Sequence, residues 1–212
     1  MATDWFRRTT WTPTDAADFT KRLARSRPHN RPQYLRIQAV HLAEAEPPHW
    51  EAALQLLDRL IHQYPDQTQL AQAHFQRAEC LLALSRADEA IEAFREAMAT
   101  ERRFPNSRTT AYLAFAYWIA TTGRVGMFEE ALDVLEEFGN DEVFPMQLYL
   151  HNAALALIAA SSGDKAVARD AARRALHASQ RLHSGFRYHP HLGLVAQSDR
   201  AVAKQLTDLA AG

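Results

Sequence analysis

Four histidines near the carboxyl end of the chain are the residues best suited to metal chemistry. They are His177, His183, His189 and His191, with Tyr188 among them. Neutral imidazole nitrogens bind zinc and other transition metals, so this group is a candidate metal site. No HExxH motif and no cysteine pair with metal-ligand spacing accompanies it. We therefore predict a surface loop without metal, and metal binding by these histidines stays open as the alternative.

Nucleophiles and paired carboxylates are the other groups that could support catalysis. The single cysteine, Cys80, falls in the middle of an expected helix, where a thiol behaves as a small buried hydrophobe. Glu129-Glu130 and Glu136-Glu137 are adjacent on an amphipathic helix and point in different directions, which favours a solvated face. The chain has no glycine-rich phosphate loop and no GxSxG motif. We predict that the protein is not an enzyme, has no catalytic residue and needs no cofactor.

The composition is typical of a folded helical protein. Of 212 residues, 47% are hydrophobic and 23% are charged, and most of the 9 prolines fall between periodic apolar segments. No run of about 18 apolar residues occurs, and the first residues lack the basic-then-apolar order of an export signal. A lone cysteine agrees with a reducing compartment. The expected location is the cytoplasm, and 21 Arg against 3 Lys favours a bacterial source.

The charges are unevenly distributed along the chain. Residues 1–36 carry 8 basic and 3 acidic side chains, residues 37–163 carry 8 and 18, and residues 164–212 carry 8 and 4. The ends are therefore basic and the middle is acidic. An acidic middle repels phosphate backbones and attracts basic proteins.

A short alanine pattern recurs four times along the chain. In each copy an alanine is followed four residues later by an apolar residue, and the leading alanines are Ala53, Ala90, Ala131 and Ala168, separated by 37, 41 and 37 residues. Three residues after each pattern comes a further apolar position, so three side chains share one helical face. The alanine allows a neighbouring helix to approach closely. The alternative is an irregular bundle in which alanine-rich amphipathic helices imitate the pattern.

These copies resemble the tetratricopeptide repeat, in which an Ala-x3-Phe helix follows a first helix of the pattern Trp-x2-Leu-Gly-x2-Tyr. The second copy matches it best, with the residues His74, Arg77, Ala78, Leu81, Ala90, Phe94 and Ala97. The resemblance implies an all-α fold, a right-handed α-solenoid of about four helix pairs with capping helices at both ends. The expected organisation is an N-terminal aromatic segment and capping helix over residues 1–33, four helix pairs over 34–183, and a loop with a C-terminal capping helix over 184–212.

The two ends carry segments outside the repeats. Thr12-Pro13-Thr14-Asp15 predicts the start of a helix that runs to about Arg25, and Trp5, Phe6 and Trp11 precede it. These aromatics either cap the first repeat or anchor a partner, and we expect the cap. A terminal helix is expected from about residue 196 to residue 209, as in other solenoids that end in a solvating helix.

The resemblance also implies a partner-binding groove lined by the first helix of each pair. The positions carried over are Gln38, Leu42, Gln72, Phe75, Glu79, Leu82, Leu113, Tyr117, Leu150 and Leu157. This set is largely apolar and lacks the Lys, Arg and Asn side chains with which related repeats clamp an acidic tail. It favours the apolar face of a partner helix or an extended apolar segment. The alternative occupants are the chain's own terminal helix and a second copy of the chain, as in a homodimer.

The function expected from these features is a non-catalytic protein–protein interaction module, an adaptor or scaffold. Its partner is expected to be apolar, basic or both. The first alternative is a bacterial immunity or chaperone-like protein that occludes a toxin or effector. The second is nucleic-acid binding through basic residues of the amino end, Arg7, Arg8, Arg22, Arg25, Arg27 and Arg31. No membrane association is expected.

Overall fold

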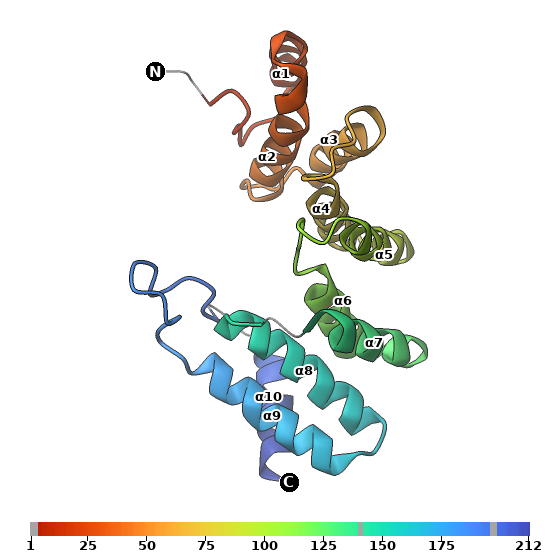
Figure 1. Cartoon of the computed structure of the whole chain (residues 1–212), viewed down its shortest axis with the longest axis vertical. Helices are drawn as coiled ribbons and strands as arrows, with labels where there is room; N and C mark the ends of the chain where they lie inside the picture. Colours follow the sequence, from red (N-terminus) through yellow and green to blue (C-terminus); the bar gives the residue numbers. More distant parts are fainter. Residues whose placement is uncertain (1–3, 140–141, 196–198) are drawn as a thin grey trace. The chain divides into compact units, whose positions relative to one another are not determined.

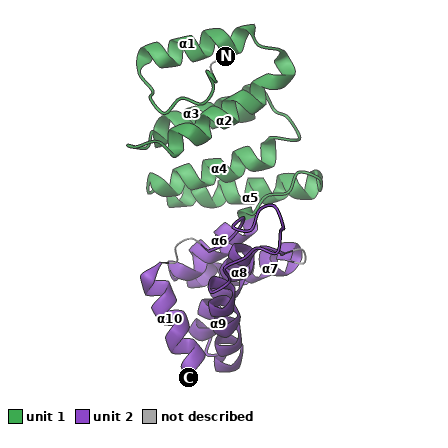
Figure 2. Ribbon diagram, turned by 90° about the vertical axis from the view of Figure 1, so that its left-hand side faces the viewer, with its two compact units in different colours: residues 1–111 green, residues 112–212 purple. Residues whose placement is uncertain are grey.

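The computed structural model describes residues 4–139, 142–195 and 199–212 (Figure 1). All regular structure within these ranges is helical, which confirms the all-α class. None of the helices described is long and apolar enough to cross a lipid bilayer. The chain divides into two compact units, residues 1–111 and residues 112–212 (Figure 2).

The first unit consists mainly of helices that pack against their neighbours in the chain. Contacts join α2 to α3, α3 to α4, and α4 to α5, and α2 also touches α4. The helices are α1 (Pro13–Arg25), a 3-10 turn η1 (Pro28–Asn30), α2 (Arg31–Ala43), α3 (Trp50–Gln63), α4 (Leu70–Ala83) and α5 (Ala87–Arg103).

The start of α1 can be explained directly from its sequence. The Thr12 hydroxyl accepts a hydrogen bond from the Asp15 N–H, and the Asp15 carboxylate accepts one from the Thr12 N–H. Pro13 occupies the first helical position, where a missing N–H costs nothing. The helix buries Phe19 and Leu23 and ends at Arg25, as expected.

The aromatic segment before α1 folds back onto α1 and α2. The Trp5 ring centre lies 5.3 Å from that of Phe19 and 5.1 Å from that of Tyr34. Phe6 stacks on Tyr34 at 4.6 Å, and Trp11 meets Phe19 edge-on at 5.6 Å. The three leading aromatics therefore pack within the first unit, and none is fully exposed.

The repeated alanine pattern lies in the cores of both units. Each of its four leading alanines is at most 1% exposed, and the apolar residue four positions later is buried in every copy. An alanine at such a position removes the steric bulk that would hold two helices apart. The helices that carry the four copies of this pattern are α3, α5, α7 and α9.

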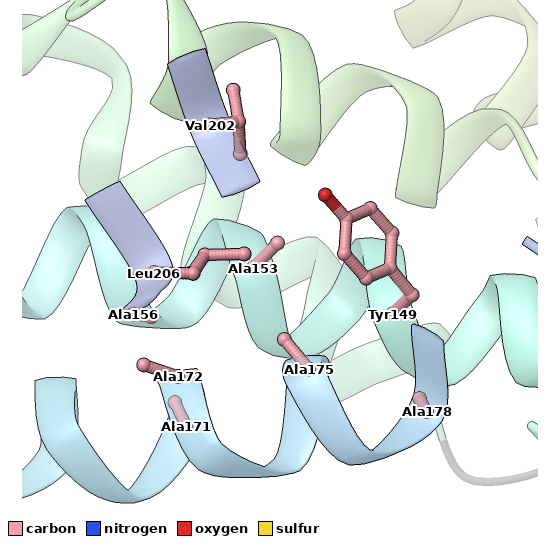
Figure 3. Close-up of a cluster of buried hydrophobic side chains, with 9 residues drawn as sticks. All are labelled: Tyr149, Ala153, Ala156, Ala171, Ala172, Ala175, Ala178, Val202 and Leu206. Carbon is pink, nitrogen blue, oxygen red and sulfur yellow. The ribbon is translucent and has the colours of Figure 1, made fainter. Parts of the chain in front are cut away.

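The second unit contains the remaining helices, and its last helix packs on the pair before it. Contacts join α8 to α9, and α10 to both. Figure 3 shows Leu206 of α10 next to Ala153 of α8, with Val202 farther along α10 and the alanines of α9 below. The helices are α6 (Ala111–Thr121), which begins at the last residue of the first unit, a 3-10 turn η2 (Val125–Met127), α7 (Phe128–Phe138), α8 (Pro145–Ser161), α9 (Lys165–Ser179) and α10 (Arg200–Ala211). The expected start of the terminal helix at residues 196–198 lies outside the described residues.

Candidate functional site

A polar, positively charged pocket lies in the first unit, and we name it the Arg36 pocket. Its volume is about 700 Å³. Three of its lining side chains are arginines, and none of the described residues that line it is acidic. It is lined by Arg36 of α2, Gln72 of α4, Gln67 and Thr68 before α4, and Arg103, Phe104, Pro105, Asn106, Ser107, Arg108 and Thr109 at the end of α5 and after it.

Arg36 is the most unusual side chain of this pocket. Its Nε donates a hydrogen bond to Oε1 of Gln69, 2.6 Å away. It forms no ion pair with any residue in the described ranges, and burial alone lowers its pKa from the usual value. A half-buried cation without a carboxylate partner is rare, because no attraction to an opposite charge offsets the free-energy cost of removing water from it. An anion bound in the pocket would supply that charge.

The segment that closes the pocket after α5 is held in a fixed shape. The Ser107 N–H donates to the Phe104 carbonyl at 2.9 Å, and the Ala111 N–H donates to the Thr109 hydroxyl oxygen at 3.0 Å. The Thr109 hydroxyl in turn donates to the carboxylate of Glu101, which is only 4% exposed. Burial raises the pKa of Glu101, and the hydrogen bonds from Thr109 and the charge of Arg108 oppose that rise.

A second pocket of opposite character lies beside it, and we name it the Glu79 pocket. Its volume is about 220 Å³. Its polar groups include two carboxylates and the Gln76 amide, and the Trp50 indole forms part of its wall. It is lined by Ala39, Val40, Ala43 and Glu44 at α2, Trp50 and Leu57 of α3, and Gln76, Glu79 and Cys80 of α4.

The polar groups of the Glu79 pocket have no positive partner in its described lining. Glu79 is exposed on α4, but the partial loss of hydration of its carboxylate raises its pKa, and the nearby Glu44 carboxylate raises it further. Oε1 of Gln76 is buried and accepts no hydrogen bond from the residues described. An unpartnered buried acceptor costs about 1–3 kcal/mol, so the pocket favours a donor or a cation.

Both pockets lie along one groove between α2 and α4. On α2 the lining residues Arg36, Val40 and Glu44 succeed one another at four-residue intervals, which keeps them on one helical face. On α4 the matching residues are Gln72 and Gln76, followed by Glu79 and Cys80. Both helices therefore run in the same sense from the cationic pocket to the acidic one. We call this surface the α2/α4 groove.

Two of the residues expected to line a groove do line this one. Gln72 belongs to the Arg36 pocket and Glu79 to the Glu79 pocket, and Leu82 of α4 is half-buried. Phe75 is buried, with 8% of its surface exposed. Its place in the groove is taken by Gln76.

The groove positions expected on α2 lie in the core. Leu42 is fully buried, and so is Gln38, whose side-chain amide donates to the Arg8 carbonyl at 2.8 Å and accepts from the Arg8 N–H at 3.1 Å. Leu113 of α6 is likewise buried, with 1% exposed. These three side chains offer no surface to a partner.

The reason for the difference on α2 is a one-residue shift in register. Buried positions of α2 and α4 match at an offset of 36 residues: Leu35 with Ala71, Ala39 with Phe75, and Leu42 with Ala78. The groove positions expected on α2 were instead placed 37 residues before those on α4. That is the spacing between Ala53 of α3 and Ala90 of α5. The connection from α2 to α3 covers residues 44–49 and that from α4 to α5 only 84–86, so one offset does not serve both helices of a pair.

In the second unit, three expected groove positions lie beside the cluster that α10 completes. Tyr117 of α6 and Leu150 and Leu157 of α8 are half-buried and pack against the cluster that contains Val202 and Leu206 of α10. Burial and the neighbouring Tyr149 raise the pKa of Tyr117. Leu157 also lines a pocket of about 440 Å³ that α10 borders through Gln205, Asp208 and Leu209.

The four histidines lie on the surface of the second unit. His177, on α9, is exposed, as are His183, His189 and His191. Their loop is anchored by the buried Ser184, whose hydroxyl donates to the His189 carbonyl at 2.7 Å. Across the three described ranges, no three His, Cys, Asp or Glu side chains are grouped so that they could hold a metal ion.

Three of the six arginines of the basic amino end form ion pairs within the chain. Arg8 pairs with Asp15 and Asp18, and Arg22 shares Asp18 at 2.9 Å. Arg7 lies 3.6 Å from Asp4. Side chains held in this way contribute less to a phosphate-binding surface than the sequence count indicates.

Comparison with family models, with curated proteins and with solved structures finds no match for this chain. A function is therefore inferred from the geometry of the two pockets.

Sequence reasoning missed the cationic pocket because its arginines come from separate segments. Arg36 lies on α2, whereas Arg103 and Arg108 flank a connection after α5. The available signal was the run from Arg102 to Thr110, in which three arginines and several hydroxyl side chains occur in a Pro-containing linker. Its distance in sequence from Arg36 concealed the pocket.

Proposed function

We propose that this chain is a non-catalytic protein-binding module, built as a right-handed α-solenoid of the tetratricopeptide-repeat kind, that holds a segment of a partner protein in the α2/α4 groove. The observation that carries the proposal is Arg36, a half-buried cation at the wall of an open pocket that pairs with no carboxylate in the described part of the chain. Such a group gains most from a partner that brings a negative charge.

The order of the helices supports the solenoid. The buried alanine pattern recurs in α3, α5, α7 and α9, each the second member of a consecutive pair. In the first unit the first members, α2 and α4, present one common surface, which is the groove. Repeat proteins of this kind use such surfaces to bind extended or helical segments.

The assignment as non-catalytic is supported by the state of the one nucleophilic thiol. Cys80 is 2% exposed, and burial raises its pKa to about 12. A thiol in this state is protonated at neutral pH and is a poor nucleophile. In the Glu79 pocket it forms part of an apolar wall.

A co-purification experiment with matched variants tests the proposal. The full chain and its Arg36→Gln variant are used as bait, with Arg95→Gln as control, because Arg95 is an exposed arginine on α5 outside both pockets. We expect one specific partner with the parent chain and the control, and roughly tenfold weaker recovery with Arg36→Gln, the loss of one charge-assisted contact. Equal recovery with all three chains would remove the groove from the binding surface.

A further inference from the structure

The two pockets of the α2/α4 groove have opposite chemistry. The Arg36 pocket offers arginines, hydroxyls and amides, and the Glu79 pocket offers carboxylates, an unpartnered amide oxygen and an indole ring. A ligand that fills only one pocket leaves the other without its counter-charge. A ligand with one charge of each sign satisfies both.

The spacing of the pockets sets the spacing of those charges. Arg36 of α2 and Glu44, the residue that caps the end of α2, lie eight residues apart, which corresponds to about 12 Å along a helix. In an extended peptide, residues i and i+4 point to the same side and are about 13 Å apart. Residues i and i+2 also share a side but are only about 7 Å apart, too close to reach both pockets.

We propose that the α2/α4 groove binds an extended segment of a partner protein in which an anionic side chain and a basic side chain are four residues apart. The anionic group enters the Arg36 pocket and the basic group enters the Glu79 pocket. This inference rests on the proposed function, and it specifies the chemistry of the partner.

The Arg36 pocket suits an oxyanion. A guanidinium presents a planar set of N–H donors that matches two oxygens of a carboxylate or phosphate. In Arg36 the Nε donor is bound to Gln69, so the Nη groups carry the contact to the ligand. The hydroxyl of Ser107 and the amide of Asn106 are further donors in the same wall, whereas the Thr68 hydroxyl donates to the Asp66 carboxylate.

The Glu79 pocket suits an ammonium or a guanidinium. Glu79 and Glu44 supply two carboxylates, and Gln76 Oε1 supplies a buried acceptor. Trp50 adds an aromatic ring to the wall, and aromatic faces attract cations. The half-buried Val40 in the same lining suits the aliphatic part of a lysine or arginine.

Peptide binding to the full chain, measured by fluorescence anisotropy, tests this inference. The probes contain Glu and Lys separated by Thr-Val-Thr, which favours an extended conformation, and both orders of the charges are used. A phosphoserine version distinguishes phosphate from carboxylate as the anion. Comparison peptides carry Gln at both charged positions or place the charges two residues apart.

We expect one order of the four-residue spacing to bind about tenfold or more tightly than the neutral and two-residue peptides. Arg36→Gln should weaken that binding about tenfold, and the loss should vanish when the peptide's Glu or phosphoserine is replaced by Gln. Glu79→Gln should show the same dependence on the peptide's Lys. Arg95→Gln should bind all the peptides as the parent chain does.

Several outcomes overturn the inference. These are binding of no peptide, equal binding of charged and neutral peptides, and losses in Arg36→Gln or Glu79→Gln that do not depend on the peptide's charges. If a co-purified protein still depends on Arg36 in those cases, the proposed function stands and only the charge pattern is wrong. If no partner protein depends on Arg36 either, both fail.

Discussion

The side chain of Arg36 is tied to that of Gln69, with 2.6 Å between Nε and Oε1. This bond joins α2 to the residue that precedes α4, across the Arg36 pocket. The four Nη–H donors make no hydrogen bond to any residue that the structure describes. The guanidinium is therefore positioned before a ligand arrives, which reduces the conformational entropy lost on binding.

Replacing Arg36 by Met should leave the fold as stable as before, or more stable by up to about 1 kcal/mol, because it removes a half-buried charge that no described carboxylate neutralises. Arg77→Met is the matched contrast, since Arg77 pairs with Asp58 at 2.7 Å. That change should lower the unfolding free energy by about 1 kcal/mol. Urea denaturation of the three chains measures both values, and a large loss in Arg36→Met alone would contradict our view of Arg36.

Replacing Gln38 by Ala should destabilise the first unit by about 2–4 kcal/mol. The change leaves the Arg8 N–H and carbonyl without their partner inside the protein and opens a cavity at a fully buried position. Gln33→Ala, at an exposed position of the same helix, is the control and should change stability by under about 0.5 kcal/mol. Equal effects in chemical denaturation would place Gln38 outside the core.

Cys80 should make stability depend on pH above neutrality. Its pKa is raised to about 12 in the fold, whereas an unfolded thiol titrates near its ordinary pKa of 9.0. The unfolded state therefore loses its proton first as pH rises, so this contribution is complete below about pH 8 and declines above about pH 9, by up to about 1.4 kcal/mol per pH unit. Unfolding free energies measured from pH 7.5 to 10.5 should fall more steeply for the parent chain than for Cys80→Ala, and identical slopes would contradict the burial of the thiol.

Replacing Gly193 by Ala should loosen the loop before α10. Gly193 has φ +66°, and an added Cβ would lie 2.6 Å from Cδ1 of Phe144. The left-handed backbone conformation of residue 193 and the clash of the added Cβ with Phe144 should together lower the unfolding free energy by about 2–4 kcal/mol. Gly163→Ala isolates the first term, because Gly163 has φ +82° but no atom within 4 Å of the added carbon, and it should cost about 1–2 kcal/mol. Limited proteolysis after residue 180 and thermal denaturation should rank the two variants in that order.

The class of the fold could be predicted from the sequence because its signal is local. The alanine pattern requires only that a helix present a small residue to its neighbour, and Ala53, Ala90, Ala131 and Ala168 are all buried. The start of α1 was equally clear, since Thr12, Pro13 and Asp15 act within one turn. Interactions within a few residues leave their mark in the local sequence.

The binding surface could not be predicted in the same way, since it depends on contacts between distant segments. The resemblance to the repeat family implied a groove position for Gln38, but it lies in the core, where its amide bonds to the Arg8 backbone of the amino-terminal segment. The arginines of the Arg36 pocket come from α2 and from the end of α5 and beyond. The predicted groove was apolar because it used the α2 register that places Leu42 outward.

The last helix has a further consequence for assembly. Val202 and Leu206 of α10 are buried against α8 and α9, while Arg200, Lys204 and Asp208 on the same helix are exposed. The helix α10 covers the apolar face formed by α8 and α9 and turns a hydrated face outward. That apolar face is therefore closed to the helices of a second molecule, and association of two copies through it would first require α10 to detach.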